Sequence, residues 1–264
     1  MYNFAYHRAG SVKEAVAAYK KGSEAKYLAG GHTLLPSMKL RLARPSDLVD
    51  VARIAELKGI KVDGGTVTIG AATPHGEVAA SAAVAKAIPA LAKLAGGIGD
   101  PAVRARGTIG GSVANSDPAA DYPAAVLGLG ATIRTDRREI AADAFFKGLF
   151  ETALEDGELI TAVSFPVPEK AGYAKFANPA SRYAIVGVFV ARTKGGVRVA
   201  ITGAGPCAHR NADMEKALSA NFAASALDGI KVKADGLNSD IHASAEYRAH
   251  LVTVMAKRAV AAAG

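Results

Sequence analysis

Two of the glycine pairs in the chain are the most informative, and the first of these interrupts an apolar run, an arrangement that restricts the fold more than any other feature. Residues 25–29 form the apolar run, Gly30 and Gly31 end it, and a helix-like segment follows over residues 34–42. Residues 47–51 can then form a second strand. The order predicts a β-loop-α-β unit, whose loop lies at the carboxyl end of its strand, where open α/β sheets bind their ligands.

The second glycine pair lies in the middle of residues 104–125. Residues 108–112 read TIGGS, and Asp117 and Asp121 follow four residues apart. Glycine lets a ligand approach the main chain, amides and hydroxyls donate to phosphate, and carboxylates accept from sugar hydroxyls. Two loops of this kind predict a ligand with a diphosphate. We expect Asp121 to contact it, whereas Asp117, which precedes Pro118, can equally begin a helix.

A third glycine-rich segment, residues 203–208, matches the dinucleotide fingerprint in its letters but not in its context. Pro206 removes an amide donor, and no βαβ unit follows the strand predicted before it. We therefore interpret GAGPCA as a turn at the end of a strand.

The cysteine and histidine side chains do not indicate a disulfide, a metal site or a catalytic nucleophile. Cys207 is the only cysteine, so the chain cannot form an internal disulfide or supply the four thiolates of an ordinary iron–sulfur cluster. The six histidines show no metal-ligand spacing, and Cys207 has no evident base partner. The predicted chemistry therefore belongs to a bound cofactor, which the protein positions.

The net charge of +8 raises the question of nucleic-acid binding. Basic residues are spread along the chain, tryptophan is absent, and aromatic residues do not alternate with Arg or Lys as base stacking would require. A basic surface, or a face for an acidic partner, explains the charge better. The N-terminus lacks the pattern of a signal peptide and no apolar stretch is long enough to span a bilayer, so we expect a cytoplasmic protein with no transmembrane segment.

The elements predicted from periodicity divide the chain near Ala171. Residues 1–170 are expected to form a cofactor domain with two parts, about 1–56 and 57–170, and residues 171–264 a smaller domain. Residues 96–116 contain too many glycines for a regular element and are interpreted as a long functional loop. The remaining strands are expected at residues 60–62, 66–69, 131–135, 138–140, 159–167, 173–176, 184–192 and 197–202, and the remaining helices at 12–21, 76–94, 119–127, 213–220, 223–227 and 243–263.

Three separated motifs resemble those of a known family. They are AGGHTLLPSMKLR at residues 29–41, GDPAVRARGTIGGSVANSDPAADYPA at residues 99–124, and GELITAVSFP at residues 157–166. Together they look like the FAD-binding medium subunits of the molybdenum hydroxylases, the xanthine dehydrogenase family, and most of all like those of aerobic carbon monoxide dehydrogenases. The resemblance extends over nearly the whole chain.

This resemblance implies an α+β fold. The expected architecture is a split α/β FAD-binding domain of the vanillyl-alcohol-oxidase (PCMH) type, followed by a C-terminal α+β domain with a three-stranded sheet and helices. It also implies non-covalently bound FAD as the only cofactor of this chain. The molybdenum cofactor would belong to a large partner subunit, and two [2Fe–2S] clusters to a small one.

The resemblance implies a function as well. Electrons leaving the molybdenum centre would pass through the iron–sulfur clusters to the flavin, and from there to an external acceptor. The complex is expected to be a dimer of heterotrimers in the cytoplasm, with attachment to the inner face of the membrane as one option. The substrate binds the large subunit in this family, so carbon monoxide, an aldehyde, a purine and other heterocycles remain open, as do quinone, NAD and oxygen as acceptors.

The cofactor contacts implied by the resemblance come from both loops and from two later positions. Ile160 matches a backbone contact to the flavin, and Lys175 a lysine near the isoalloxazine, where a cation stabilises negative charge on the reduced ring. Tyr183 is expected beside the flavin. The full set of implied FAD contacts is Ala29, Gly30, Gly31, His32, Thr33, Leu34, Thr108, Ile109, Gly110, Gly111, Ser112, Asp121, Ile160 and Lys175.

Several alternatives stay open within this interpretation. His32 can hydrogen-bond the ligand, attach a flavin covalently, or bond a backbone carbonyl, and the glycines at residues 30 and 31 can serve a tight connection alone. Gly110 is expected to face the diphosphate, so that valine there would abolish FAD retention without unfolding the chain. The whole protein can also be a stand-alone FAD-dependent oxidase or dehydrogenase of the same fold, or a scaffold subunit without flavin.

Overall fold

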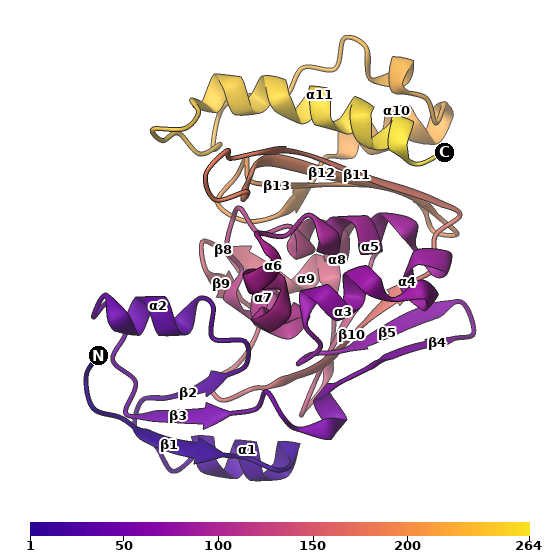
Figure 1. Ribbon diagram of the computed structural model, residues 1–264. Coiled ribbons are helices and arrows are strands. Elements are labelled where there is room, and N and C mark those ends of the chain that lie inside the picture. The colour runs from indigo at the N-terminus through magenta and orange to yellow at the C-terminus, as the bar shows by residue number, and fades with distance from the viewer.

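The computed structural model describes all 264 residues and stacks three layers, with the N-terminal part at the bottom of Figure 1 and the C-terminal part at the top. The lowest layer is a parallel three-stranded sheet of order β1-β3-β2, with α1 and α2 on opposite faces. The predicted β-loop-α-β unit is present as β2, α2 and β3. The bounds are β1 (Ala5–Arg8), α1 (Val12–Tyr19), β2 (Ala25–Leu28), α2 (Leu34–Lys39), β3 (Asp47–Asp50) and η1 (Ala55–Leu57).

The middle layer is an antiparallel sheet of order β4-β5-β10-β6-β7, with a group of short helices on the side that faces the C-terminal part. Every strand predicted for this region is present, within one or two residues of the expected bounds. The strands are β4 (Ile60–Asp63), β5 (Thr66–Gly70), β6 (Thr132–Thr135), β7 (Glu139–Ala141) and β10 (Ile160–Pro166), and a small ribbon is formed by β8 (Phe146–Gly148) and β9 (Glu151–Thr152).

The expectation that residues 96–116 form an irregular loop was wrong. This stretch contains α6 (Pro101–Arg106) and α7 (Ile109–Asn115). The Asp100 side chain accepts from the amide of Val103, and the Thr108 hydroxyl from that of Gly111, so each short helix begins at a side-chain cap. The other helices of this layer are α3 (His75–Ala80), α4 (Ala82–Ala87), α5 (Pro89–Gly96), α8 (Tyr122–Gly128) and α9 (Ala142–Phe145).

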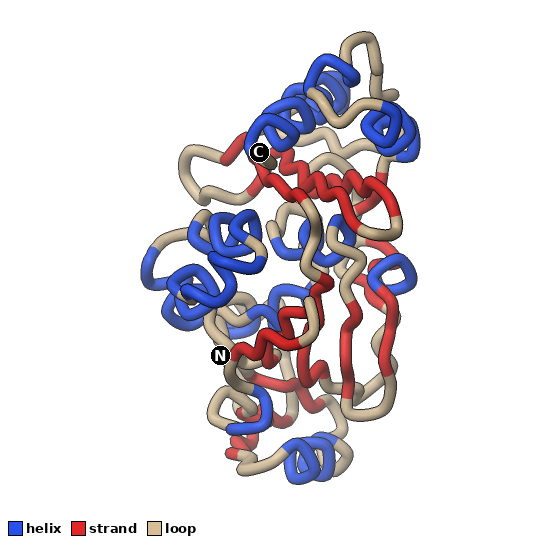
Figure 2. The backbone as a smooth tube through the Cα atoms, turned by 90° about the vertical axis from the view of Figure 1, so that its right-hand side faces the viewer, coloured by secondary structure: helices blue, strands red, loops and turns tan.

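The C-terminal part is an antiparallel sheet with helices on its outer face, as Figure 2 shows from the side. The three expected strands are present, and the two residues of β14 add a fourth strand at the edge. The elements are β11 (Lys170–Ala177), β12 (Ala184–Thr193), β13 (Gly196–Thr202), β14 (His209–Arg210), α10 (Ala212–Ala220), η2 (Ala224–Leu227) and α11 (Ala245–Ala262).

Two of the three layers share a hydrophobic core. Tyr173, Phe189 and Ala200 of the C-terminal sheet pack in one cluster with the helices of the middle layer, whereas the opposite face of the sheet packs on α11. The N-terminal layer has a separate core of 8 buried residues. No helix is both long and apolar enough to cross a membrane.

Candidate cofactor site

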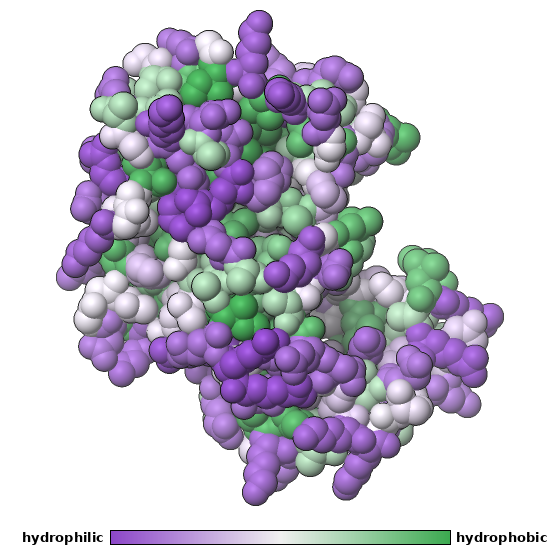
Figure 3. Space-filling view, turned by 180° about the vertical axis from the view of Figure 1, so that it is seen from behind, coloured by the Kyte–Doolittle hydropathy of each residue, from purple (hydrophilic) through white to green (hydrophobic).

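A cavity of about 660 Å³ lies where the three layers meet, and both glycine loops line it. Figure 3 shows the surface hollowed between the N-terminal layer and the rest of the molecule. The volume is in the range of sites for cofactor-sized molecules. Of the residues predicted to contact a cofactor, the lining includes Ala29, Gly30, Gly31, His32, Thr33, Leu34, Thr108, Gly110, Gly111, Ser112, Asp121 and Ile160.

The first glycine loop, residues 29–34, carries main-chain donors that the protein does not use. The amides from Gly30 to Leu34 donate to no acceptor of the protein, although the carbonyls of Gly31 and Thr33 accept from α2. Gly31 has a φ of 76°, a left-handed conformation that glycine adopts without strain. Five consecutive free amides at the edge of a cavity can bind an anion such as phosphate.

The second glycine loop, residues 108–112, uses its donors to fix its own position. The amides of Ile109 and Gly110 donate to the carbonyls of Thr73 (3.2 Å) and Ala71 (2.9 Å), which follow β5. Those of Gly111 and Ser112 donate to the hydroxyl and the carbonyl of Thr108. The loop is therefore a fixed wall of the cavity, and the hydroxyls of Ser112 and Thr108 and the amide of Thr108 are its polar groups not used as donors within the protein.

Gly110 lines the cavity and also packs closely against Ala71, another residue of the lining. A methyl group on Gly110 would lie 2.5 Å from the Cβ and 2.8 Å from the carbonyl oxygen of Ala71, so the expectation that valine there leaves the fold undisturbed conflicts with this packing. Ile109 is buried in the core and does not line the cavity. Gly111, by contrast, is exposed, and a methyl group there would meet only the Thr108 hydroxyl at 3.0 Å.

The two loops touch each other through glycine. A methyl group on Gly30 would lie 2.1 Å from the carbonyl oxygen of Arg106 and 2.8 Å from the Cα of Gly107. No side chain fits between these two segments of main chain. The glycine at residue 30 therefore allows the first loop to pack against the second. Of the two roles left open for this glycine, ligand binding and a tight connection, the structure supports at least the second.

Asp121 lies at the base of the cavity, almost fully buried, and is held by two groups of β11. Tyr173 donates its hydroxyl to Oδ1, and the Lys175 ammonium lies 3.0 Å from the carboxylate. Burial raises the pKa of Asp121, and Lys175 and Tyr173 oppose that shift. The carboxylate keeps lone pairs for a further donor, such as a sugar hydroxyl.

Lys175 lies behind Asp121 and not at the cavity surface. Its ammonium also donates to the carbonyls of Gly97 and Arg182, and the residue is not part of the lining. The Asp121 carboxylate therefore lies between the Lys175 ammonium and the cavity. A ring bound in the cavity would experience the charge of Lys175 together with that of Asp121.

The remaining predicted positions also have defined places. Asp117 lines the cavity, and its carboxylate accepts from the amide of Ala119, while the helix begins only at Tyr122. Tyr183, on the hairpin between β11 and β12, also lines the cavity, close enough to Asp117 and Asp121 for their charges to raise its pKa, and is 46% exposed. The His32 side chain is exposed and bonds no backbone carbonyl, which eliminates one of its three predicted roles.

Sequence reasoning missed His75, a buried residue of the cavity wall at the start of α3. A weak signal existed, because Thr73-Pro74 directly before it predicts a helix start close to the end of β5. The turn of residues 203–208, in contrast, lies outside the cavity, and the Gly203 amide donates to the carbonyl of Pro118. No group of three His, Cys, Asp or Glu side chains could hold a metal ion.

Fold and site together define a dinucleotide-binding protein of the α+β class. The free amides suit a diphosphate, the buried carboxylate suits a sugar hydroxyl, and apolar lining residues such as Leu57, Leu154 and Ile160 suit an aromatic ring.

Comparison with known proteins identifies the family. Residues 2–168 match the model described as the FAD binding domain in molybdopterin dehydrogenase. The carbon monoxide dehydrogenase medium chain of Hydrogenophaga pseudoflava is 37% identical over 98% of this chain and 96% of its own length. The xanthine dehydrogenase FAD-binding subunit of Escherichia coli O157:H7 is 29% identical over 100% of this chain and 99% of its own.

A solved structure shares the fold as well. The structure titled reconstituted CO dehydrogenase from Oligotropha carboxidovorans contains a chain that superposes with a TM-score of 0.91 at 35% identity, over 99% of this chain and 98% of that one. The chain belongs to the family of FAD-binding subunits of the molybdenum hydroxylases. It is an FAD-binding oxidoreductase subunit, as the resemblance implied.

Proposed function

We propose that this chain transfers electrons within a molybdenum hydroxylase complex. It would accept them from the [2Fe–2S] clusters of a small subunit and pass them to an external acceptor, and the molybdenum centre would lie in a large subunit. The observation that supports this most is the row of free amides from Gly30 to Leu34, beside a second loop that is already fixed. Bound FAD supplies the chemistry, because a flavin exchanges electrons singly or in pairs.

The residues of this chain bind and orient the cofactor in this proposal. The first loop binds the diphosphate, Ser112 and the Thr108 hydroxyl border it, and Asp121 accepts from a sugar hydroxyl. Lys175 and Tyr173 orient Asp121 and oppose the rise in its pKa that burial causes. The Ile160 main chain and Tyr183 would border the isoalloxazine, and the low polarity of the remaining lining would exclude water from it.

The assembly and location are part of the proposal. Relatives named medium chain or medium subunit support a complex with a small and a large subunit. A dimer of heterotrimers in the cytoplasm, attached to the inner membrane face or free, is the arrangement we expect. The substrate and the acceptor would be set by the partner subunits.

The proposal is tested on the complex purified with the products of the neighbouring genes. Its FAD is removed, the iron–sulfur clusters are reduced, and reduction of an artificial quinone is followed before and after FAD is restored. We expect cluster reduction in both samples and acceptor reduction only with FAD. Equal rates of acceptor reduction without FAD, or a purified complex without flavin absorption, would refute the proposal.

A further inference from the structure

His75 lies directly behind the contact between the two glycine loops. Its amide donates to the carbonyl of Gly107 at 2.9 Å, and a methyl group on Gly107 would lie 2.7 Å from Nε2 of the imidazole. Gly107 in turn packs against Gly30. His75 also lines the cavity, and its ring is close enough to His32 of the first loop for that residue to affect its pKa.

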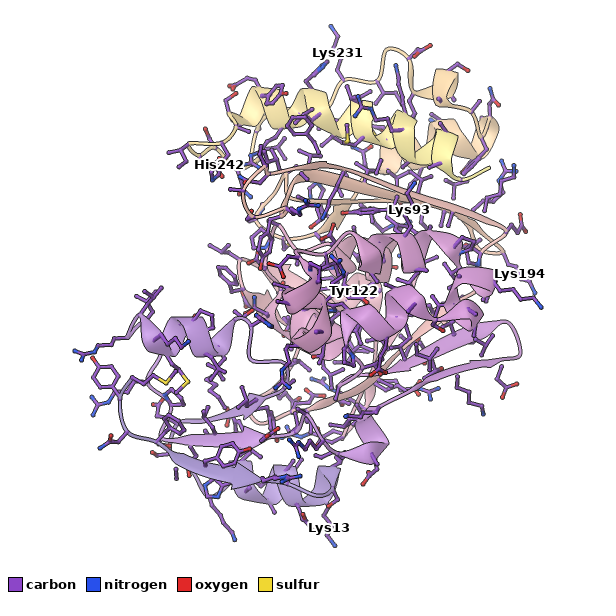
Figure 4. All side chains as sticks on the ribbon, viewed as in Figure 1. Lys13, Lys93, Tyr122, Lys194, Lys231 and His242 are labelled. Carbon is purple, nitrogen blue, oxygen red and sulfur yellow. The ribbon has the colours of Figure 1, made fainter.

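The His75 imidazole has no hydrogen-bond partner in the protein. Nδ1 is fully buried and unpaired, whereas Nε2 is not fully buried and makes no hydrogen bond to the protein, so Nε2 is the atom that a ligand can reach; the residue as a whole is 5% exposed. Tyr122 of α8, labelled in Figure 4, stacks obliquely on the ring at a centroid distance of 5.3 Å, and its buried hydroxyl is also unpaired. Buried polar atoms are nearly always paired in native proteins, so an unpaired imidazole in a cavity wall indicates a ligand.

The charge of the imidazole depends on what lies beside it. Burial lowers the pKa of His75 to about 4, and the proximity of His32 adds to this effect, so the ring is neutral near pH 7. An anion in contact with the ring favours the protonated form and opposes both effects. A diphosphate at the first loop is such an anion.

The other charged groups on α3 and on the elements packed against it do not shift the pKa of His75. Glu77 of α3 itself, Lys86 of α4 and Lys93 of α5 are exposed. On α6, Arg104 donates to the carbonyls of Ile98 and Gly99, and Arg106 is exposed. On α8, Asp121 is paired with Lys175. None of them contributes to the shift at His75, whereas His32 does.

We propose that His75 is a cofactor-binding residue that takes up a proton from solvent when FAD enters, and then pairs as an imidazolium with the diphosphate. This inference rests on the proposed placement of the diphosphate at the first loop. It makes FAD binding proton-linked, with affinity rising as pH falls. The affinity is constant at high pH, where the ring stays neutral in both states, and rises by up to about tenfold per pH unit where only the complex is protonated.

The test uses the complex with its FAD removed, titrated with FAD between pH 5.5 and 8.5. Fluorescence quenching gives the affinity, and calorimetry in two buffers of different ionisation enthalpy gives the protons taken up. We expect up to one proton per FAD in the acidic half of the range. His75→Gln should lose both the pH dependence of FAD binding and the proton uptake.

Two variants identify the residue. His32→Gln removes the other imidazole of the cavity and should leave most of the proton uptake in place. His75→Asn repeats the test with a smaller neutral side chain, and assembly of the complex together with its circular dichroism shows that each variant is folded. Proton uptake that disappears in His32→Gln and persists in His75→Gln would overturn the inference.

The outcomes separate the inference from the proposed function. FAD binding that is independent of pH, or equally pH-dependent in His75→Gln, refutes the role of His75 and leaves the proposed function standing. If the wild-type complex binds FAD at no pH, the proposed function fails and this inference fails with it.

Discussion

The two glycine loops have similar sequences and opposite relations to the rest of the protein. In the first loop, the amides from Gly30 to Leu34 have no partner, and most of the loop is at least partly exposed. In the second, the amides from Ile109 to Ser112 are all bonded, and residues 107–110 are buried. The comparison shows that a glycine pair can either present donors to a ligand or make room for close packing. One cavity here uses both.

The second loop is fixed from two sides, and the C-terminal sheet contributes one of them. Behind the loop, β5 supplies the acceptor carbonyls. After the loop, the Thr202 hydroxyl donates to the carbonyls of Pro118 and Ala120, and Lys175 bonds Asp121. The first loop has no such supports beyond its contact at Gly107. We therefore expect mutations around the second loop to reduce stability and those in the first loop to reduce FAD affinity.

The largest effect is expected from Lys175→Gln, which leaves the buried Asp121 carboxylate without its cation. Removing one partner of a buried ion pair costs about 3–5 kcal/mol of unfolding free energy. Urea denaturation of the full chain measures this loss. Lys194→Gln, in the exposed turn labelled in Figure 4, is the matched control and should change stability little. A loss below about 1 kcal/mol in Lys175→Gln would show that the pair does not hold the second loop.

Gly110→Val and Gly111→Val separate the packing role of the second loop from its ligand contact. Valine at Gly110 overlaps Ala71 and should lower the unfolding free energy by about 1–3 kcal/mol or more. Gly111 also lines the cavity, but a methyl group there meets only the Thr108 hydroxyl, so for Gly111→Val we expect nearly normal stability with a loss of FAD binding. Thermal unfolding and FAD titration of both variants test this. Equal stability of the two variants would contradict this assignment.

In the first loop, Gly31→Ala strains a left-handed residue at a cost of about 1–2 kcal/mol. Because the free amides depend on this conformation, FAD affinity should fall at least tenfold. Gly65→Ala, in the β4–β5 turn, is the matched control, since its φ is 81° and no atom lies within 4 Å of the added methyl group. The control shares the backbone strain but not the contact of the added methyl group with Leu35 at 2.8 Å, so it should lose no more stability than Gly31→Ala and bind FAD normally. If both variants bind FAD normally, the first loop is not the diphosphate site.

The smallest effects are expected from removing one hydroxyl in each loop. Thr108→Ala removes the cap of α7 and should lower the unfolding free energy by about 1 kcal/mol. Thr33, at the corresponding position before α2, makes no side-chain cap hydrogen bond, so Thr33→Ala should leave stability unchanged. Chemical denaturation of the two variants provides the measurement. If Thr33→Ala lost more unfolding free energy than Thr108→Ala, the conclusion that the second loop matters more for stability than the first would be contradicted.

The sequence predicted the β-loop-α-β unit and most strands of the two antiparallel sheets, but not β1, β8, β9, β14, α6 or α7. The β-loop-α-β unit and the hairpins follow from local periodicity and turn residues, and the family motifs lie where the cavity is. The helices α6 and α7 were missed because they have six and seven residues and depend on caps at Asp100 and Thr108, not on an apolar stripe. Such short elements carry little periodicity to detect.

The division of roles between the loops could not be predicted from the sequence. Whether an amide of residues 108–112 is free depends on the carbonyls of Ala71 and Thr73, which are distant in sequence and close only in the fold. The same holds for Lys175, whose position behind Asp121 depends on the packing of β11 against the middle layer. His75 was missed because its unpaired ring is a property of burial, which one histidine in a sequence does not indicate.

The most direct test is amide hydrogen exchange along the two loops in the complex, with and without FAD. The account predicts that the amides of residues 30–34 exchange rapidly without FAD and become strongly protected when it binds, because they donate to the diphosphate. The amides of residues 109–112 should be protected in both states. Protection by FAD that appears at residues 109–112 and not at residues 30–34 would contradict the account.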